Sequence, residues 1–115
     1  MSAYTPVCRI EQVPVERGVA ALVGTEQVAL FRTVDGTVHA LGNRDPFSGA
    51  MVLSRGIVGS RGATATVASP MYKQVFDLAS GVCLDEPDVA VPAYPVQVRN
   101  GLVEVAVTAQ ERRLA

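Results

Sequence analysis

Hydrophobic residues in this chain come in short runs separated by turn-forming residues, and the runs predict β-strands rather than helices. In the first part of the chain these strands fall at 7–10, 19–23, 27–33 and 38–41. Asp35-Gly36 separates the last two and favours a tight hairpin, because glycine accepts a positive φ. The amino-terminal part is therefore predicted to be a small antiparallel meander.

In the remainder of the chain, short hydrophobic runs are again separated by turn-forming residues. A short strand is predicted at 64–68, and a hairpin at 73–78 and 82–84 around Ala79-Ser80-Gly81. Two prolines make 91–95 an extended edge segment, and Asn100-Gly101 joins strands at 96–99 and 102–107. We therefore expect an all-β fold in a single domain, 1–115, with its core at 7–107 and a frayed tail at 108–115.

Composition agrees with a β domain and excludes several partners. Hydrophobic residues make up 49% of the 115 residues but aromatic residues only 5%, so valine, alanine and leucine must build the core. The net charge of −1 gives no basic field for nucleic acid. The amino terminus does not have the form of a signal peptide, and no apolar run approaches the ~20 residues that span a bilayer. A cytoplasmic protein that binds neither nucleic acid nor membrane is expected.

A glycine-punctuated stretch at 54–62 has the spacing G-x-x-G-x-x-G. A dinucleotide fingerprint needs G-x-G-x-x-G before a helix, and a P-loop needs a following lysine, so neither is present. We interpret these glycines as tight turns between short strands.

The candidate reactive side chains are few. His39 is the sole histidine and lies in a predicted strand, where a structural or solvent-facing role is expected. Cys8 and Cys83 have no metal or redox spacing and are interpreted as small core thiols, with a disulfide between them left open.

Two turn-forming tips, Asp45-Pro46-Phe47-Ser48-Gly49 and Ser69-Pro70-Met71-Tyr72, stand about twenty residues apart in the sequence. They resemble the two loops of a Rieske iron-sulfur domain, which have the forms Cys-Pro-His-x-Gly and Cys-Pro-x-His. Asp45 and Ser69 stand where the cysteines would be, and Phe47 and Tyr72 where the histidines would be. We hypothesise that packing of the two aromatic rings and turn hydrogen bonds replace the cluster in holding the loops together; the alternative is that both rings point into solvent or against a neighbouring sheet.

The segments NRDPFSGA, LSRGIVG and SPMYKQVFDLASGVCLDEP further resemble the small subunit of assimilatory NAD(P)H-dependent nitrite reductase, a cluster-free member of the Rieske fold. This resemblance implies a Rieske-like fold of three stacked antiparallel sheets, with a two-loop subdomain at one end. It also implies a non-catalytic subunit that binds or stabilises a large subunit in nitrate assimilation. That large subunit carries FAD, sirohaem and an iron-sulfur cluster and reduces nitrite to ammonia. No catalytic, cofactor-binding or metal-binding residue of this chain follows from the resemblance.

The loop tips are the expected docking surface, since true Rieske proteins expose their histidine ligands there. Basic and aromatic side chains in or near the loops would contact the large subunit, and these are Arg44, Phe47, Arg55, Arg61, Tyr72 and Lys73.

Two other functions remain open at this point. An electron-transfer ferredoxin would need an unusual centre in which Asp45 and Ser69 ligate iron, and Phe47 leaves that ligand set incomplete. A stand-alone, cluster-free protein-interaction module would have no reductase partner. Iron and sulfide analysis separates the first of these from a nitrite reductase subunit, and identification of the bound partner separates the second.

Overall fold

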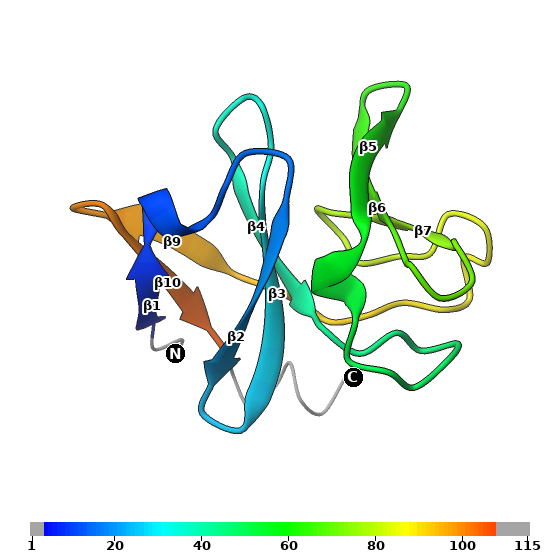
Figure 1. The fold of residues 1–115 in the computed structure, drawn as a ribbon, viewed down its shortest axis with the longest axis horizontal. Helices are drawn as coiled ribbons and strands as arrows, with labels where there is room; N and C mark the ends of the chain where they lie inside the picture. Colours follow the sequence, from blue (N-terminus) through cyan, green and yellow to red (C-terminus); the bar gives the residue numbers. More distant parts are fainter. Residues whose placement is uncertain (1–3, 108–115) are drawn as a thin grey trace.

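The computed structural model describes residues 4–107 and consists of three antiparallel sheets joined by loops (Figure 1). The tail expected to fray at 108–115 lies outside the described residues. The first sheet has the strand order β1-β10-β9, so the two ends of the described chain pair with each other. Its strands are β1 (Tyr4–Arg9), β9 (Val96–Arg99) and β10 (Leu102–Ala106).

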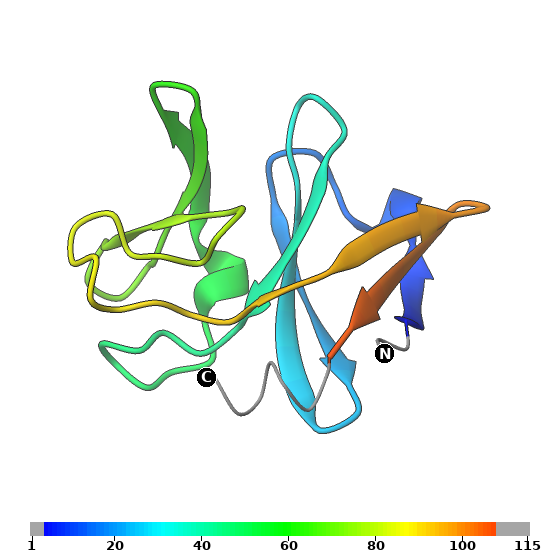
Figure 2. The ribbon, with the colours of Figure 1, turned by 180° about the vertical axis from the view of Figure 1, so that it is seen from behind.

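The second sheet lies in the middle and the third stands beside it (Figures 1 and 2). The second has the order β2-β3-β4-β8 and the third the order β5-β6-β7. The strands of the second sheet are β2 (Gly18–Val23), β3 (Glu26–Arg32), β4 (Val38–Gly42) and β8 (Ala93–Tyr94). The strands of the third are β5 (Ile57–Arg61), β6 (Thr64–Ala68) and β7 (Val75–Asp77). Two single turns of 3-10 helix, η1 (Ile10–Gln12) and η2 (Leu53–Arg55), complete the elements.

Strand β3 explains why the sheets stack as three layers. Its residues Val28 and Leu30 belong to the core shared with the first sheet, and Ala29 and Phe31 to the core shared with the third. All four side chains are fully buried. Because successive side chains of a strand point to opposite faces, one uncharged stretch of β3 supplies both cores. The predicted all-β fold with three antiparallel sheets is confirmed.

The predicted hairpin turns at Asp35-Gly36 and Asn100-Gly101 are present. Gly36 has φ of 89°, and Asn100 and Gly101 have φ of 52° and 78°. The predicted strands at 64–68 and 96–99 match β6 and β9 residue for residue.

Three details of the predicted pattern are wrong. In place of the predicted strand at 82–84, Val82 and Cys83 form isolated bridges to Ala90 and Phe76. Ile10 begins η1, so the first strand is Tyr4–Arg9 rather than 7–10. Strand β5 is not predicted by the pattern, because Gly59 at its centre reads as a turn; the glycine accepts extended backbone opposite Thr66. Within residues 4–107 no helix is long and apolar enough to cross a membrane.

The first loop leaves β4 and returns through η2 to β5, and the second joins β6 to β7. Both lie at the same end of the molecule, away from the first sheet (Figure 2). The fold therefore brings together two segments that the sequence separates.

Candidate functional site

The first loop is a compact turn closed by its own backbone. The Asp45 amide donates to the Ala50 carbonyl (2.8 Å), and the Gly49 amide donates to the Asp45 carbonyl (2.7 Å). The Asp45 carboxylate also accepts from the Phe47 amide at Oδ1 (2.8 Å). Gly49 has a φ of 79°, which the reversal of the chain requires.

The second loop repeats this arrangement position by position. The Ser69 amide donates to the Gln74 carbonyl (2.9 Å), and the Lys73 amide donates to the Ser69 carbonyl (3.0 Å). The Ser69 hydroxyl accepts from the Met71 amide (3.3 Å). Lys73, with φ of 66°, occupies the position of Gly49. The two loops are thus copies of one turn, and Asp45 and Ser69 hold equivalent positions in them.

A direct hydrogen bond links these equivalent positions. The Ser69 hydroxyl donates to Asp45 Oδ2 over 2.5 Å, across 24 residues of sequence. Asp45 is 0% exposed and Ser69 1% exposed, so the bond lies in the interior between the loops. Each carboxylate oxygen accepts one hydrogen bond, as a buried carboxylate requires.

The two aromatic residues at the other matched positions behave differently. Phe47 is half-buried and packs against the fully buried Phe76, with ring centroids 6.3 Å apart and an interplanar angle of 51°. Tyr72 is 60% exposed and its neighbour Met71 46% exposed. The expectation that Tyr72 fills the space between the loops is therefore wrong. The Tyr72 side chain lies on the outside of the second loop, whereas the Phe47 ring packs inward against Phe76.

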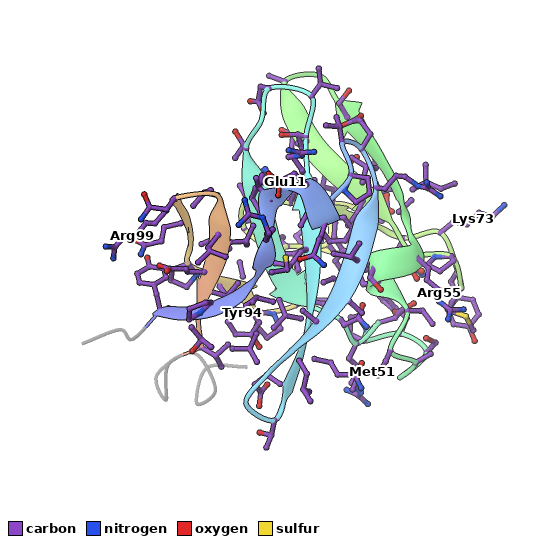
Figure 3. All side chains as sticks on the ribbon, turned by 60° about the vertical axis from the view of Figure 1, so that its left-hand side comes forward. Glu11, Met51, Arg55, Lys73, Tyr94 and Arg99 are labelled. Atoms are coloured by element: carbon purple, nitrogen blue, oxygen red, sulfur yellow. The ribbon has the colours of Figure 1, made fainter. Side chains whose placement is uncertain are left out.

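Three exposed cations lie in or beside the two loops. Arg44, Arg55 and Lys73 are exposed, and Figure 3 shows Arg55 and Lys73 on one side with Met51, opposite Arg99. Arg61 joins this group only by its place in the sequence. Its guanidinium forms an ion pair with Asp85 (2.9 Å), at the edge of the third sheet.

Asn43 supports the first loop from beneath, although no sequence motif singles it out. It is only 2% exposed, and its Oδ1 accepts from the Ser54 amide (2.8 Å). Its backbone bonds to Gln27 of β3 and to Leu53 of η2. A single asparagine thus ties the loop and η2 to the central sheet. The only signal for it is a polar residue directly after an apolar strand.

The donor atoms between the loops are those of a carboxylate and a hydroxyl that already bond to each other. The third matched position is a phenylalanine ring with no donor atom. Both thiols lie elsewhere, Cys8 on β1 and Cys83 in the core of the third sheet, and neither is in a disulfide. Among residues 4–107, no three His, Cys, Asp or Glu side chains are grouped so that they could hold one metal ion. The residues present do not fit the ligand set of a 2Fe-2S cluster.

His39 lies on β4 opposite Phe31 and is half-buried. Burial lowers the pKa of its imidazole below the usual 6.5, while the carboxylates of Asp35 and Asp77 act in the opposite direction. No residue of the two loops adjoins it in the register of the strands.

This histidine should make stability depend on pH. Because the folded chain disfavours the charged imidazole, the unfolded chain binds more protons as the pH falls through 6.5. The free energy of unfolding is expected to decline in that window and to level off below the folded-state pKa. His39→Gln should remove this decline, as measured by urea unfolding between pH 8 and pH 5. Asp35, with a pKa lowered to about 2 by bonds from Thr33 and Thr37, titrates below this range. Equal slopes for the two proteins would contradict the assignment.

Comparisons with known proteins agree on one family. The family model of the Rieske-like [2Fe-2S] domain matches residues 3–106. The small subunit of NADH nitrite reductase from Escherichia coli strain K12 is 40% identical over 106 residues, 91% of this chain and 98% of the relative. A crystal structure of a Mycobacterium tuberculosis chain, assigned as an NADH-dependent nitrite reductase small subunit, superimposes with a TM-score of 0.91. It is 51% identical, and the match covers 95% of this chain and 98% of that one.

A third relative has a different chain organisation. The NAD(P)H nitrite reductase large subunit of Klebsiella oxytoca contains a segment 44% identical to this chain over 102 residues. The segment covers 89% of this chain and 11% of that large subunit.

Proposed function

We propose that this chain, which belongs to the Rieske-like [2Fe-2S] domain family, is a non-catalytic subunit that binds and stabilises a cofactor-bearing large subunit. Within the family it is a homologue of the small subunit of NADH-dependent nitrite reductase. The reaction of the assembly is the reduction of nitrite to ammonia with reduced nicotinamide as donor, in nitrate assimilation. A cytoplasmic setting, in which Cys8 and Cys83 stay reduced, fits their free thiols.

The observation that carries the non-catalytic role is the Asp45–Ser69 hydrogen bond. Where a Rieske domain would have two thiolates, this chain has a carboxylate and a hydroxyl that satisfy each other in the interior. Reduction of nitrite to ammonia takes six electrons, which side chains alone cannot hold and deliver. FAD, sirohaem and an iron-sulfur cluster are therefore assigned to the large subunit. This chain contributes by contact with it.

The Klebsiella relative supports the choice of partner. In that protein a domain similar to this chain is part of the large subunit, so this domain and the remainder of the large subunit are permanently joined in one chain. We expect the separate chains to have kept the surfaces by which the corresponding parts contact each other in the single chain. This favours a nitrite reductase subunit over a stand-alone interaction module.

The loop tips are the proposed docking surface. Tyr72 and Met71 present apolar area at the tip, and Arg44, Arg55 and Lys73 surround it. In the two loops the only acidic residue is the buried Asp45. The complementary surface of the large subunit is therefore apolar at its centre and acidic at its rim. Phe47 supports the tip from below through Phe76, and Arg61, bound to Asp85, takes a peripheral part.

Charge reversal tests this surface. The double variant Arg55→Glu/Lys73→Glu is expected to bind the large subunit at least about tenfold more weakly at low salt, because two attractive rim contacts become repulsive. Binding is measured by titration of the purified large subunit, together with its rate of NADH-dependent nitrite reduction. Arg99→Glu, on the opposite side of the molecule, should leave binding unchanged (Figure 3). Equal affinities for the double variant and the unmodified chain would remove the loop tips from the interface.

Metal analysis tests the role itself. The purified chain is expected to contain no stoichiometric iron or sulfide. A brown protein with the electron-spin signal of a reduced two-iron centre would instead establish an electron-transfer ferredoxin.

A further inference from the structure

Strand β2 is an unprotected edge of the central sheet. It occupies the end of the order β2-β3-β4-β8 and runs for six residues, GVAALV. It has neither a charged residue nor a proline, and its register with β3 is unbroken. Such an edge offers a template for an added strand, and natural proteins normally protect or cover it.

The other edges of the described sheets carry protection. Strand β1 has Pro6 and a register shift beside it. Strand β8 has two residues and stands between Pro92 and Pro95. The outer side of β7 is bridged by Phe76 to Cys83. Strands β5 and β9 end in the charged residues Arg61 and Arg99. Among the edge strands of the described sheets, β2 therefore has the least protection against pairing with another strand.

The register fixes which backbone groups of β2 are free to pair. Val23 pairs with Glu26 across the two-residue turn, so Val23, Ala21 and Val19 exchange hydrogen bonds with β3. The alternate residues, Ala20 and Leu22, therefore direct their N–H and C=O groups outward. No backbone hydrogen bond joins this side of β2 to another described segment.

A groove runs along these free groups. It lies between β2 and β1, the edge strand of the first sheet, and has a volume of about 330 Å³. Both strands are on the side turned forward in Figure 3. Leu22 is 69% exposed at its rim, and Cys8 is half-buried in its wall. Its side chains are apolar apart from one amide, and backbone groups contribute polar surface; the lining residues are Val7, Cys8, Gln12, Val19, Ala20, Ala21, Leu22 and Leu30.

From the free edge and the groove beside it, we infer that the seam between β1 and β2 binds an extended, apolar segment of the nitrite reductase large subunit as an added strand. This inference rests on the proposed function and assigns it a second contact, distinct from the loop tips. Strand addition uses backbone hydrogen bonds for affinity and the groove for alternate apolar side chains. The absence of charge along β2 makes an uncharged segment the matching occupant.

The occupant is the large subunit rather than a second copy of this chain. In the Klebsiella large subunit, the similar domain shares one chain with the remaining large part of the protein. A strand from the rest of that large subunit can cover the β2 edge of its own domain in every molecule. Pairing of two β2 edges would instead join two large subunits to each other.

Hydrogen–deuterium exchange of the full chain, alone and bound to the purified large subunit, tests the inference directly. The amides of Ala20 and Leu22 are expected to exchange at least about tenfold more slowly in the complex. Those of Ala21 and Val23, already bonded to β3, should change less. Slow exchange of Ala20 and Leu22 in the free chain that disappears on dilution would identify a second copy as the occupant and overturn the inference.

A matched pair of variants tests the same edge by affinity. Leu22→Lys places on β2 the charge that other edges carry, and is expected to weaken binding to the large subunit about tenfold or more. Val34→Lys makes the same change at a side chain of 77% exposure in the β3–β4 turn, and should have no effect. Thermal unfolding of both variants checks that they are folded.

The outcomes separate this inference from the function on which it rests. If the unmodified chain does not bind the large subunit, both are overturned. If it binds, but β2 gains no protection and Leu22→Lys binds normally, the strand addition alone is overturned.

Discussion

Replacing Asp45 with alanine is expected to lower the free energy of unfolding by about 3–5 kcal/mol. The Asp45 carboxylate accepts two hydrogen bonds, from the Phe47 amide and the Ser69 hydroxyl, at a position that is 0% exposed. Hydrogen bonds to charged groups contribute about 1.5–3 kcal/mol each, and their loss leaves buried donors unpaired. The midpoint of thermal unfolding should fall by more than about 10 °C.

Ser69→Ala provides the control, because it removes the bond between the loops together with the longer turn bond from the Met71 amide, and leaves the Asp45 carboxylate with its bond from Phe47. It should cost about 1.5–3 kcal/mol, and the double variant should cost clearly less than the sum of the two single changes. Urea unfolding of the four proteins closes this cycle. Additive effects would mean that the loops are not coupled through this bond, and another contact would have to hold them together.

The architecture follows from local signals that can be recognised directly in the sequence. Asp35-Gly36 and Asn100-Gly101 fix two hairpins, and the uncharged stretch in β3 serves the cores on both of its faces. These local signals give a wrong prediction where one residue type occurs both in turns and in strands. Gly59 looks like a turn because glycine often makes one, but here it lies in β5, and pairing with β6 outweighs its weak strand propensity.

The site could be located from the sequence, but its internal contacts could not. Sequence reasoning expects Asp45 and Ser69 to cap their own turns, and each does accept a nearby backbone amide. Their bond to each other depends on how two loops approach in space, which no local pattern encodes. The same limit applies to Tyr72, whose 60% exposure follows from the orientation of the second loop. It applies also to Arg61, whose partner Asp85 lies 24 residues away.

The loop pair also shows which contacts of this chain's own residues hold the two loops together. Two equivalent turns close on their own backbone, and one buried hydrogen bond joins them. Phe47 and Phe76 add apolar contact on one side. The side chain of Tyr72 takes no part in these contacts and is 60% exposed. The buried contacts between the loops and the proposed docking residues at the tip are thus different side chains, so stability and docking can be tested by different substitutions.

Gly81→Ala is the second change expected to have a large effect. Gly81 follows β7 with a φ of 80°, and a Cβ placed on it would lie 2.2 Å from the Val91 carbonyl oxygen. This oxygen belongs to the backbone and cannot move aside alone, because the Val91 amide donates to the Gly81 carbonyl (2.9 Å). Alanine therefore faces both an unfavourable φ and a steric overlap, and a loss of about 3 kcal/mol or more is expected.

Gly24→Ala separates these two causes. Gly24 has a similar φ of 62° in the β2–β3 turn, but nothing lies within 4 Å of the position that a Cβ would take there. Only the unfavourable backbone conformation acts at this position, so a loss of about 1–2 kcal/mol is expected. Chemical unfolding of both variants gives the comparison. If Gly81→Ala costs no more than Gly24→Ala, the segment around Val91 can shift, and its contact with the turn after β7 does not fix that part of the fold.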